Sequence, residues 1–118
     1  MTKKRVRHAL RPPALEMVAG RFRLLGEPNR LRLLLALEAG PKTVSELVQL
    51  TGCSQANVSR HLQSLTEAGL LGRRKEGLRV YYFIADESIF ELCDNVCGSL
   101  QKRLGAQAKA FETRRLDR

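Results

Sequence analysis

The spacing of apolar residues along the 118-residue chain predicts five helices and, before the last of them, a pair of strands. Apolar residues recur three or four positions apart in each predicted helix. In the strands they are β-branched or aromatic, and Glu76-Gly77 lies where an antiparallel hairpin would turn. The predicted helices cover residues 14–25, 29–39, 44–50, 55–68 and 86–104, and the strands cover residues 71–75 and 80–84. The fold class is therefore mainly α with one β-hairpin, in the order α-α-α-α-β-β-α.

The fourth predicted helix has one apolar face and one polar face. Val58, Leu62 and Leu65 share the apolar face. A helix that lies against base edges in the major groove of DNA needs short hydrogen-bonding groups and little negative charge. The opposite face has this composition, with one arginine and no acidic residue; its members are Gln55, Ala56, Ser59, Arg60 and Gln63. The pattern favours a DNA recognition helix.

The residues before this helix predict its partner helix and the turn between them. Thr43 and Glu46 have the spacing of a capping box, in which each side chain bonds a main-chain N–H across the first helical turn. Residues 51–53 include a glycine and make a tight turn, and Ser54 is a good N-cap for the fourth helix. A short helix, a three-residue turn and a second helix predict a helix-turn-helix.

The predicted hairpin is strongly basic, with Glu76 as its single acidic residue. A basic hairpin directly after a recognition helix is typical of the wing of a winged helix-turn-helix, although an ordinary charged hairpin is the alternative. We expect the wing side chains, with Ser54 and Asn57, to contact phosphates or the minor groove. The basic residues of the wing are Arg73, Arg74, Lys75 and Arg79.

The recognition helix supplies the other expected DNA contacts. Glutamine pairs well with adenine and arginine with guanine in the major groove. For His61 two roles stay open, a hydrogen-bonded structural histidine and a phosphate contact. The residues predicted to contact DNA from this helix are Ser54, Gln55, Ala56, Asn57, Ser59, Arg60 and His61.

The net charge of +9 suggests a nucleic acid or an anionic membrane surface as partner. Five basic residues and no acidic residue give residues 1–13 a charge of +5, and six basic against two acidic residues give residues 102–118 a charge of +4. We expect a disordered basic arm over residues 1–13, which would add non-specific attraction to phosphates. The winged helix-turn-helix domain would cover residues 14–104, and a basic tail or helix extension would cover residues 105–118.

Several classes of protein are excluded on composition. No apolar run approaches the roughly 18 residues of a membrane span, and no apolar segment of a signal peptide follows the basic N-terminus. Three cysteines do not suggest a secreted disulfide framework, so a reducing cytosol is the expected location. The sequence has no nucleophile–base constellation, phosphate loop or metal-ligand cluster of the kind enzymes use, so we expect no enzymatic activity.

The first and last helices each have an apolar stripe that a domain of this size cannot cover from within. By contrast, the helix at 29–39 is apolar on nearly all sides and should be central and buried. We therefore expect the first and last helices to form a two-fold homodimer interface. Two recognition helices would then lie about 34 Å apart and bind an inverted-repeat operator in double-stranded DNA. The last stripe comprises Ile89, Cys93, Val96, Cys97, Leu100 and Leu104.

Cys93 and Cys97 are four residues apart and share one face of the last helix, with Cα atoms about 6 Å apart. Two thiolates so placed can bind a soft ion such as arsenite or cadmium, with a third donor from a partner subunit. The alternative is that both are small apolar residues of the dimer interface. Cys53 lies before the recognition helix, where its thiol either senses oxidants or packs between two helices.

The combined motifs resemble the ArsR/SmtB family of bacterial winged-helix repressors. The similar segments are G-E-P-N-R-L-R-L-L at 26–34, the helix-turn-helix at 45–65, E-A-G-L-L at 67–71 and R-V-Y-Y-F-I at 79–84. The resemblance implies a homodimer that represses a promoter and leaves it when an inducer binds. Inducers in the family include metal ions, arsenite and reactive sulfur species.

Three sensing sites known in the family are incomplete here. The segment 45–50 lacks the cysteine pair of one, and residues 29–39 lack the cysteine of another. Asp86 matches the first ligand of a zinc-type site, but Ser88, Ser99 and Lys102 stand at its later positions. We therefore expect a DNA-binding repressor whose inducer, if it has one, acts at cysteines. The alternative is an inducer-independent winged-helix protein with structural cysteines.

Overall fold

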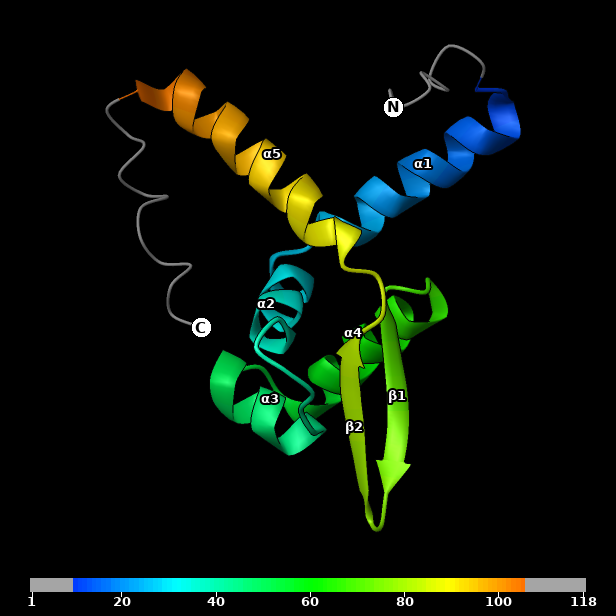
Figure 1. The fold of residues 1–118 in the computed structure, drawn as a ribbon, viewed down its shortest axis with the longest axis vertical. Coiled ribbons are helices and arrows are strands. Elements are labelled where there is room, and N and C mark those ends of the chain that lie inside the picture. Colours follow the sequence, from blue (N-terminus) through cyan, green and yellow to red (C-terminus); the bar gives the residue numbers. More distant parts are fainter. Residues whose placement is uncertain (1–9, 106–118) are drawn as a thin grey trace.

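The computed structural model describes residues 10–105, and within them the predicted order of elements is confirmed (Figure 1). The predicted basic arm and the predicted basic tail lie mostly in residues 1–9 and 106–118, outside the described residues. The elements are α1 (Pro12–Leu25), α2 (Pro28–Leu37), α3 (Val44–Thr51), α4 (Gln55–Glu67), β1 (Leu71–Glu76), β2 (Arg79–Ile84) and α5 (Ser88–Leu104).

Most helix and strand boundaries differ from the predictions by one or two residues, and at three places the local reason is clear. Helix α1 begins at Pro12, because proline needs no N–H partner in the first turn of a helix. Helix α5 begins at Ser88, since the Asp86 carboxylate accepts hydrogen bonds from the Ser88 N–H (3.0 Å) and hydroxyl (2.6 Å). The hairpin turns at Gly77-Leu78, where Gly77 adopts a φ of +64°. Each strand is consequently at least one residue longer at the tip than predicted.

The hydrophobic core lies where α2 packs against α3 and α4. Leu33, Leu34 and Leu37 of α2 are almost fully buried. The expectation that α2 is central and buried is confirmed for these three leucines, but Leu35 of the same helix is 55% exposed. Leu35 lies about 160° around the helix from Leu37, so it points away from the elements that cover the other leucines. The remaining buried residues are Leu25, Leu47, Val58, Leu62, Leu65, Leu70, Leu71 and Ile89.

The sheet is the antiparallel pair β1–β2, with Leu71 opposite Ile84 at its base and Glu76 opposite Arg79 at its tip. Lys42 adds an isolated bridge to β2: its N–H donates to the Tyr82 carbonyl (3.0 Å) and its carbonyl accepts from the Tyr82 N–H (2.8 Å). This bridge joins the wing to the segment that precedes α3. The sequence did not predict it, since a single residue after a proline leaves no alternating pattern.

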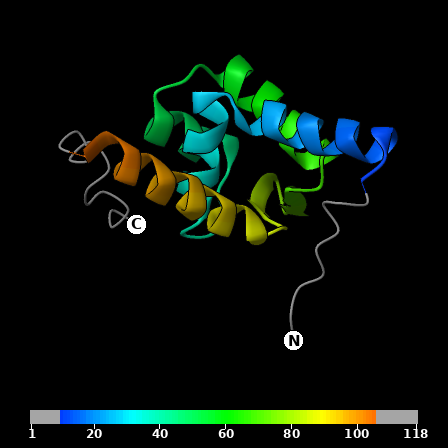
Figure 2. The same ribbon diagram turned by 90° about the horizontal axis from the view of Figure 1, so that it is seen from above.

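Helices α1 and α5 diverge from the body of the molecule and point to opposite sides in both views (Figures 1 and 2). Their outer faces have exposed apolar side chains, as expected for a single copy of the chain. Within residues 10–105, no helix is long and apolar enough to cross a membrane. The exposed apolar residues of the two stripes include Leu15, Val18 and Phe22 on α1 and Val96 and Leu100 on α5.

Candidate nucleic-acid interface

The local structure of the helix-turn-helix follows from its caps. Thr43 Oγ1 accepts from the Glu46 N–H (3.2 Å), and the Glu46 carboxylate accepts from the Thr43 N–H (2.9 Å). Gly52 ends α3 with a φ of +78°, a conformation that favours glycine. Ser54 Oγ then accepts from the Asn57 N–H (3.2 Å) and caps α4. The predicted capping box, turn and N-cap are all confirmed.

Helix α4 has a buried face and an exposed face, as predicted. Val58, Leu62 and Leu65 are completely buried. Asn57 Oδ1 accepts a hydrogen bond from the Arg60 guanidinium (2.6 Å), which holds this cation beside the first turn of the helix. Over the first two turns the rest of the exposed face is short and uncharged, so it offers hydrogen-bonding groups without bulk; the exposed acid Glu67 lies at the end of the helix. The exposed side chains are Gln55, Ala56, Asn57, Ser59, Arg60, Gln63 and Glu67.

His61 is separated from this exposed face. His61 is only 6% exposed, and Arg30 Nε donates a hydrogen bond to its Nδ1 (3.1 Å). Its Nε2 lies 3.9 Å from Glu27 Oε1. Burial, followed by the charge of Arg30, lowers the pKa of His61, which Glu27 partly opposes. These contacts favour the structural role of His61 over a contact with DNA phosphates.

The wing divides its basic side chains between two faces, because side chains alternate along a strand. Arg74 lies on the face of Tyr81 and Phe83, with its guanidinium 5.8 Å and 5.7 Å from the two ring centroids. Its Nε also donates to the Glu76 carboxylate (2.6 Å). Arg73 lies on the other face, 5.8 Å from the centroid of Tyr82. The sequence grouped these two arginines together, but the structure gives them different surroundings.

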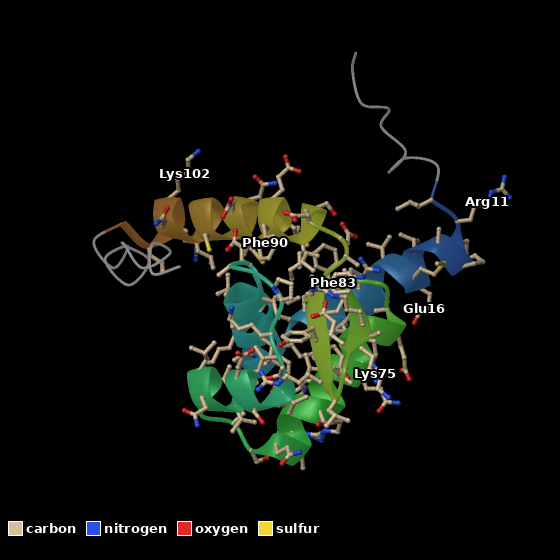
Figure 3. All side chains as sticks on the ribbon, turned by 60° about the horizontal axis from the view of Figure 1, so that its bottom comes forward. Arg11, Glu16, Lys75, Phe83, Phe90 and Lys102 are labelled. Atoms are coloured by element: carbon tan, nitrogen blue, oxygen red, sulfur yellow. The ribbon has the colours of Figure 1, made fainter. Side chains whose placement is uncertain are left out.

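The other two basic residues of the wing lie nearer its tip, and both are exposed. Lys75 extends from the wing, whereas Phe83 lies deeper in the molecule (Figure 3). The wing points away from the free ends of α1 and α5, which are marked by Arg11 and Lys102 on opposite sides of the same view (Figure 3). The basic wing and the two apolar stripes therefore occupy opposite ends of the molecule.

The cysteines occupy two different surroundings. Cys53 is half-buried and packs against the core, and its N–H donates to Thr51 Oγ1 (3.2 Å). On α5, Cys93 is half-buried and Cys97 is exposed. Burial raises the pKa of the Cys93 thiol, and the negative charge of Cys97, Asp94 and Glu38 raises it further. Within the described part of the chain, no three His, Cys, Asp or Glu side chains gather in a way that could hold a metal ion.

Comparison with known proteins identifies the family. Residues 25–74 match the family described as a helix-turn-helix domain. A probable mercury resistance operon repressor of Streptomyces lividans is 37% identical over 71 residues, which are 60% of this chain and 57% of that protein. The homodimeric winged helix-turn-helix domain of a possible ArsR-family transcriptional regulator from Mycobacterium bovis has a TM-score of 0.69 at 31% identity, covering 90% of this chain and 95% of that one. This chain belongs to the ArsR/SmtB family.

A second curated member of the ArsR/SmtB family is the cadmium resistance transcriptional regulatory protein CadC of Listeria innocua. It is 35% identical over 78 residues, which are 65% of this chain and 66% of that protein. This chain therefore spans less than two thirds of the length of the mercury repressor and of CadC.

In the resemblance to the ArsR/SmtB family, Asp86 matches the first ligand position of a zinc-type site. In this structure its carboxylate makes contacts within the chain instead. It accepts two hydrogen bonds from Ser88, the first residue of α5, and lies 4.0 Å from the Arg21 guanidinium of α1. The hydrogen bonds from Ser88 hold the pKa of Asp86 below its usual value. Sequence reasoning missed this contact, because no local pattern links residue 21 to residue 86.

Proposed function

We propose that this member of the ArsR/SmtB family is a sequence-specific transcriptional repressor that reads the major groove of DNA with the exposed face of α4. The observation that supports this best is the two-faced character of α4. One face is buried in the core. The other exposes Gln55, Ser59 and Arg60, and no acidic residue lies in the first two turns of the helix. Amide and guanidinium groups are the side chains that pair with adenine and guanine in that groove.

The proposed protein is a homodimer joined through α1 and α5. The exposed apolar stripes of these helices support this arrangement, and the related Mycobacterium bovis domain is described as homodimeric. A two-fold dimer places two copies of α4 about one duplex turn apart, roughly 34 Å. The proposed operator is therefore an inverted repeat.

Charge supports an approach to DNA from the end of the molecule that holds the wing. Arg73, Lys75 and Arg79 are exposed there and would contact phosphates or the minor groove, together with Ser54 and Asn57. The basic segments 1–13 and 105–118 would add non-specific attraction to the same polyanion. A repressor acts on the chromosome, so we place the protein in the bacterial cytoplasm, associated with the nucleoid.

Selection of bound duplexes from a random pool tests this proposal. The full chain should enrich an inverted repeat whose half-sites are about one helical turn apart. Gln55→Ala should relax the preference at one base pair of each half-site, by about 1–3 kcal/mol. Gln63→Ala is the matched control, since Gln63 lies on the last turns of α4 and donates to Glu67 (3.1 Å). Binding without any enriched sequence would instead favour an architectural, non-specific DNA-binding protein.

We further propose that a thiophilic ion, such as arsenite, cadmium(II) or mercury(II), induces release at Cys93 and Cys97. Both thiols lie on the α5 stripe that would face the second subunit, which can supply a further donor. Burial and, after it, negative neighbours raise the pKa of Cys93 and so disfavour a free thiolate. The negative neighbours also disfavour the approach of an anionic polysulfide, whereas bound cadmium(II) or mercury(II) would relieve the repulsion. The names of two relatives refer to mercury and cadmium resistance.

The half-burial of Cys93 also favours a second candidate, an inducer-independent regulator in which the cysteines only pack. Titration of the reduced protein–duplex complex separates the two. Arsenite, cadmium(II), polysulfide and peroxide are added in turn, and anisotropy reports the fraction of duplex bound. Release by the thiophilic ions that is abolished in Cys93→Ser and Cys97→Ser supports sensing, with Cys53→Ser as the matched control. Indifference to all four reagents supports packing.

A further inference from the structure

A partly buried polar cluster joins the recognition helix to the junction of α1 and α2. Arg30 lies at its centre: Nε donates to His61 Nδ1 (3.1 Å), and a terminal nitrogen donates to the Leu24 carbonyl near the end of α1 (3.1 Å). Glu27 caps α2 by accepting from the N–H groups of Asn29 (2.7 Å) and Arg30 (3.3 Å). The same Glu27 oxygen lies 3.9 Å from His61 Nε2. Three segments of the chain therefore meet at one imidazole ring.

The hydrogen bond from Arg30 selects one state of this ring. An arginine Nε always bears its proton, so His61 Nδ1 must be unprotonated in order to accept from it. The neutral ring then has its proton on Nε2, on the side of Glu27. A second proton would have to occupy Nδ1, where it would remove the acceptor and face the guanidinium. The observed contact therefore requires the neutral histidine.

We propose that Arg30 and His61 are positioning residues that fix the orientation of α4 relative to α1, and that protonation of His61 weakens DNA binding by breaking this contact. The inference rests on the proposed function and extends it to residues that do not touch DNA. His61 follows Arg60 directly and is two residues from Ser59, so a rotation of α4 at His61 displaces both side chains of the reading face. Because Arg30 also holds Leu24, the contact links this face to the helix proposed to form the dimer.

The charged groups around the ring make protonation unfavourable at neutral pH. Arg30 faces the ring from α2 and Arg60 belongs to α4 itself, and both lower the pKa of His61; Glu27, at the start of α2, raises it. Burial acts in the same direction as the two arginines and is the largest cause. The transition is therefore expected below the ordinary histidine value of about 6.5. An exposed histidine has the opposite effect on binding, since its protonation adds positive charge and strengthens attraction to DNA.

The test is the affinity for the selected duplex at constant salt between about pH 7.5 and 4.5, for the wild type and three variants. Wild-type affinity should fall by about tenfold in acid, the size expected for one hydrogen bond to a charged group. His61→Gln can still accept a hydrogen bond and should bind about as well as the wild type near neutrality, without the loss in acid. His8→Gln is the matched control and should retain the loss. An equal loss in wild type and His61→Gln would overturn the inference.

Arg30→Lys provides a second variant in case His61→Gln is unfolded. It keeps the positive charge but cannot bond His61 and the Leu24 carbonyl in the same geometry. Its affinity near neutrality should already be about tenfold lower, and little further loss should occur in acid. A normal affinity with a normal pH profile in Arg30→Lys would overturn the inference while leaving the proposed function intact. A wild type that binds no duplex at any pH would overturn both.

Discussion

The Arg21 side chain of α1 donates a hydrogen bond to the main-chain carbonyl of Ala68, at the C-terminal cap of α4 (3.1 Å). The same guanidinium lies 4.0 Å from the Asp86 carboxylate, which accepts hydrogen bonds from Ser88 at the start of α5. One arginine therefore connects the end of the recognition helix to both helices that have exposed apolar stripes. Together with the contact between Arg30 and His61, it holds α4 at two points along its length.

Loss of the Arg21 contact should destabilise the fold. Arg21→Gln should lower the free energy of unfolding by about 1 kcal/mol, because the Ala68 carbonyl loses a charged donor. Arg23→Gln is the matched control on the same helix; Arg23 pairs with Glu16 (3.5 Å), and both side chains are largely exposed. That control should change stability by less than about 0.5 kcal/mol. Urea unfolding followed by circular dichroism measures both, and equal effects would contradict the role assigned to Arg21.

Asp86 should contribute to the pH dependence of stability. Its pKa is lower in the folded chain than in the unfolded chain, so it stabilises the fold above its unfolded pKa of about 4. This contribution is lost as the pH falls through the folded pKa. Asp86→Asn should therefore be less stable than the wild type at neutral pH, and the difference should shrink in acid. Unfolding at a series of pH values measures it, and a difference that stays constant would contradict this account.

A companion variant isolates the cause of that shift. Ser88→Ala removes the hydroxyl that donates to Asp86 Oδ1 (2.6 Å), the largest contribution to the low pKa. The pKa of Asp86 in this variant should rise toward its usual value. Carbon-13 NMR titration of the carboxyl group reports it directly, and an unchanged pKa would show that the hydroxyl is not responsible.

Two basic residues of the wing, Arg79 and Arg74, should differ in their contribution to DNA binding. Arg79→Gln should reduce the slope of log affinity against log salt by about one unit, without changing the preferred sequence. Arg74→Gln should reduce it less, because Glu76 already neutralises Arg74 in the free protein. Anisotropy titrations over a range of salt concentrations compare the two. An unchanged slope in Arg79→Gln would remove the wing from the interface.

Local patterns predicted the elements of this fold well. The capping box at Thr43 and Glu46, the N-cap at Ser54 and the apolar face of α4 were all predicted, because each depends on residues within one or two helical turns. The exposed stripe of α1 was also predicted. Its prediction rests on the size of the domain, which is too small to cover both end helices.

Contacts between distant segments were not predictable in the same way. The bridge between Lys42 and Tyr82 and the hydrogen bond from Arg30 to His61 depend on how helices and strands are placed in three dimensions. His61 shows the consequence for the candidate site. The sequence favoured a structural role and left a phosphate contact as the alternative, and the burial of the ring with its hydrogen bond from Arg30 supports the structural role.

Protection of guanine N7 tests whether α4 lies in the major groove, because that atom is reached only from the groove that α4 is proposed to enter. Dimethyl sulfate is applied to the selected duplex with saturating wild-type protein and with Arg60→Ala. The wild type should protect guanines in both half-sites, and Arg60→Ala should occupy the same site while exposing one guanine in each. A saturated wild-type complex whose major-groove guanines all remain reactive would contradict the assignment of α4 as the recognition helix.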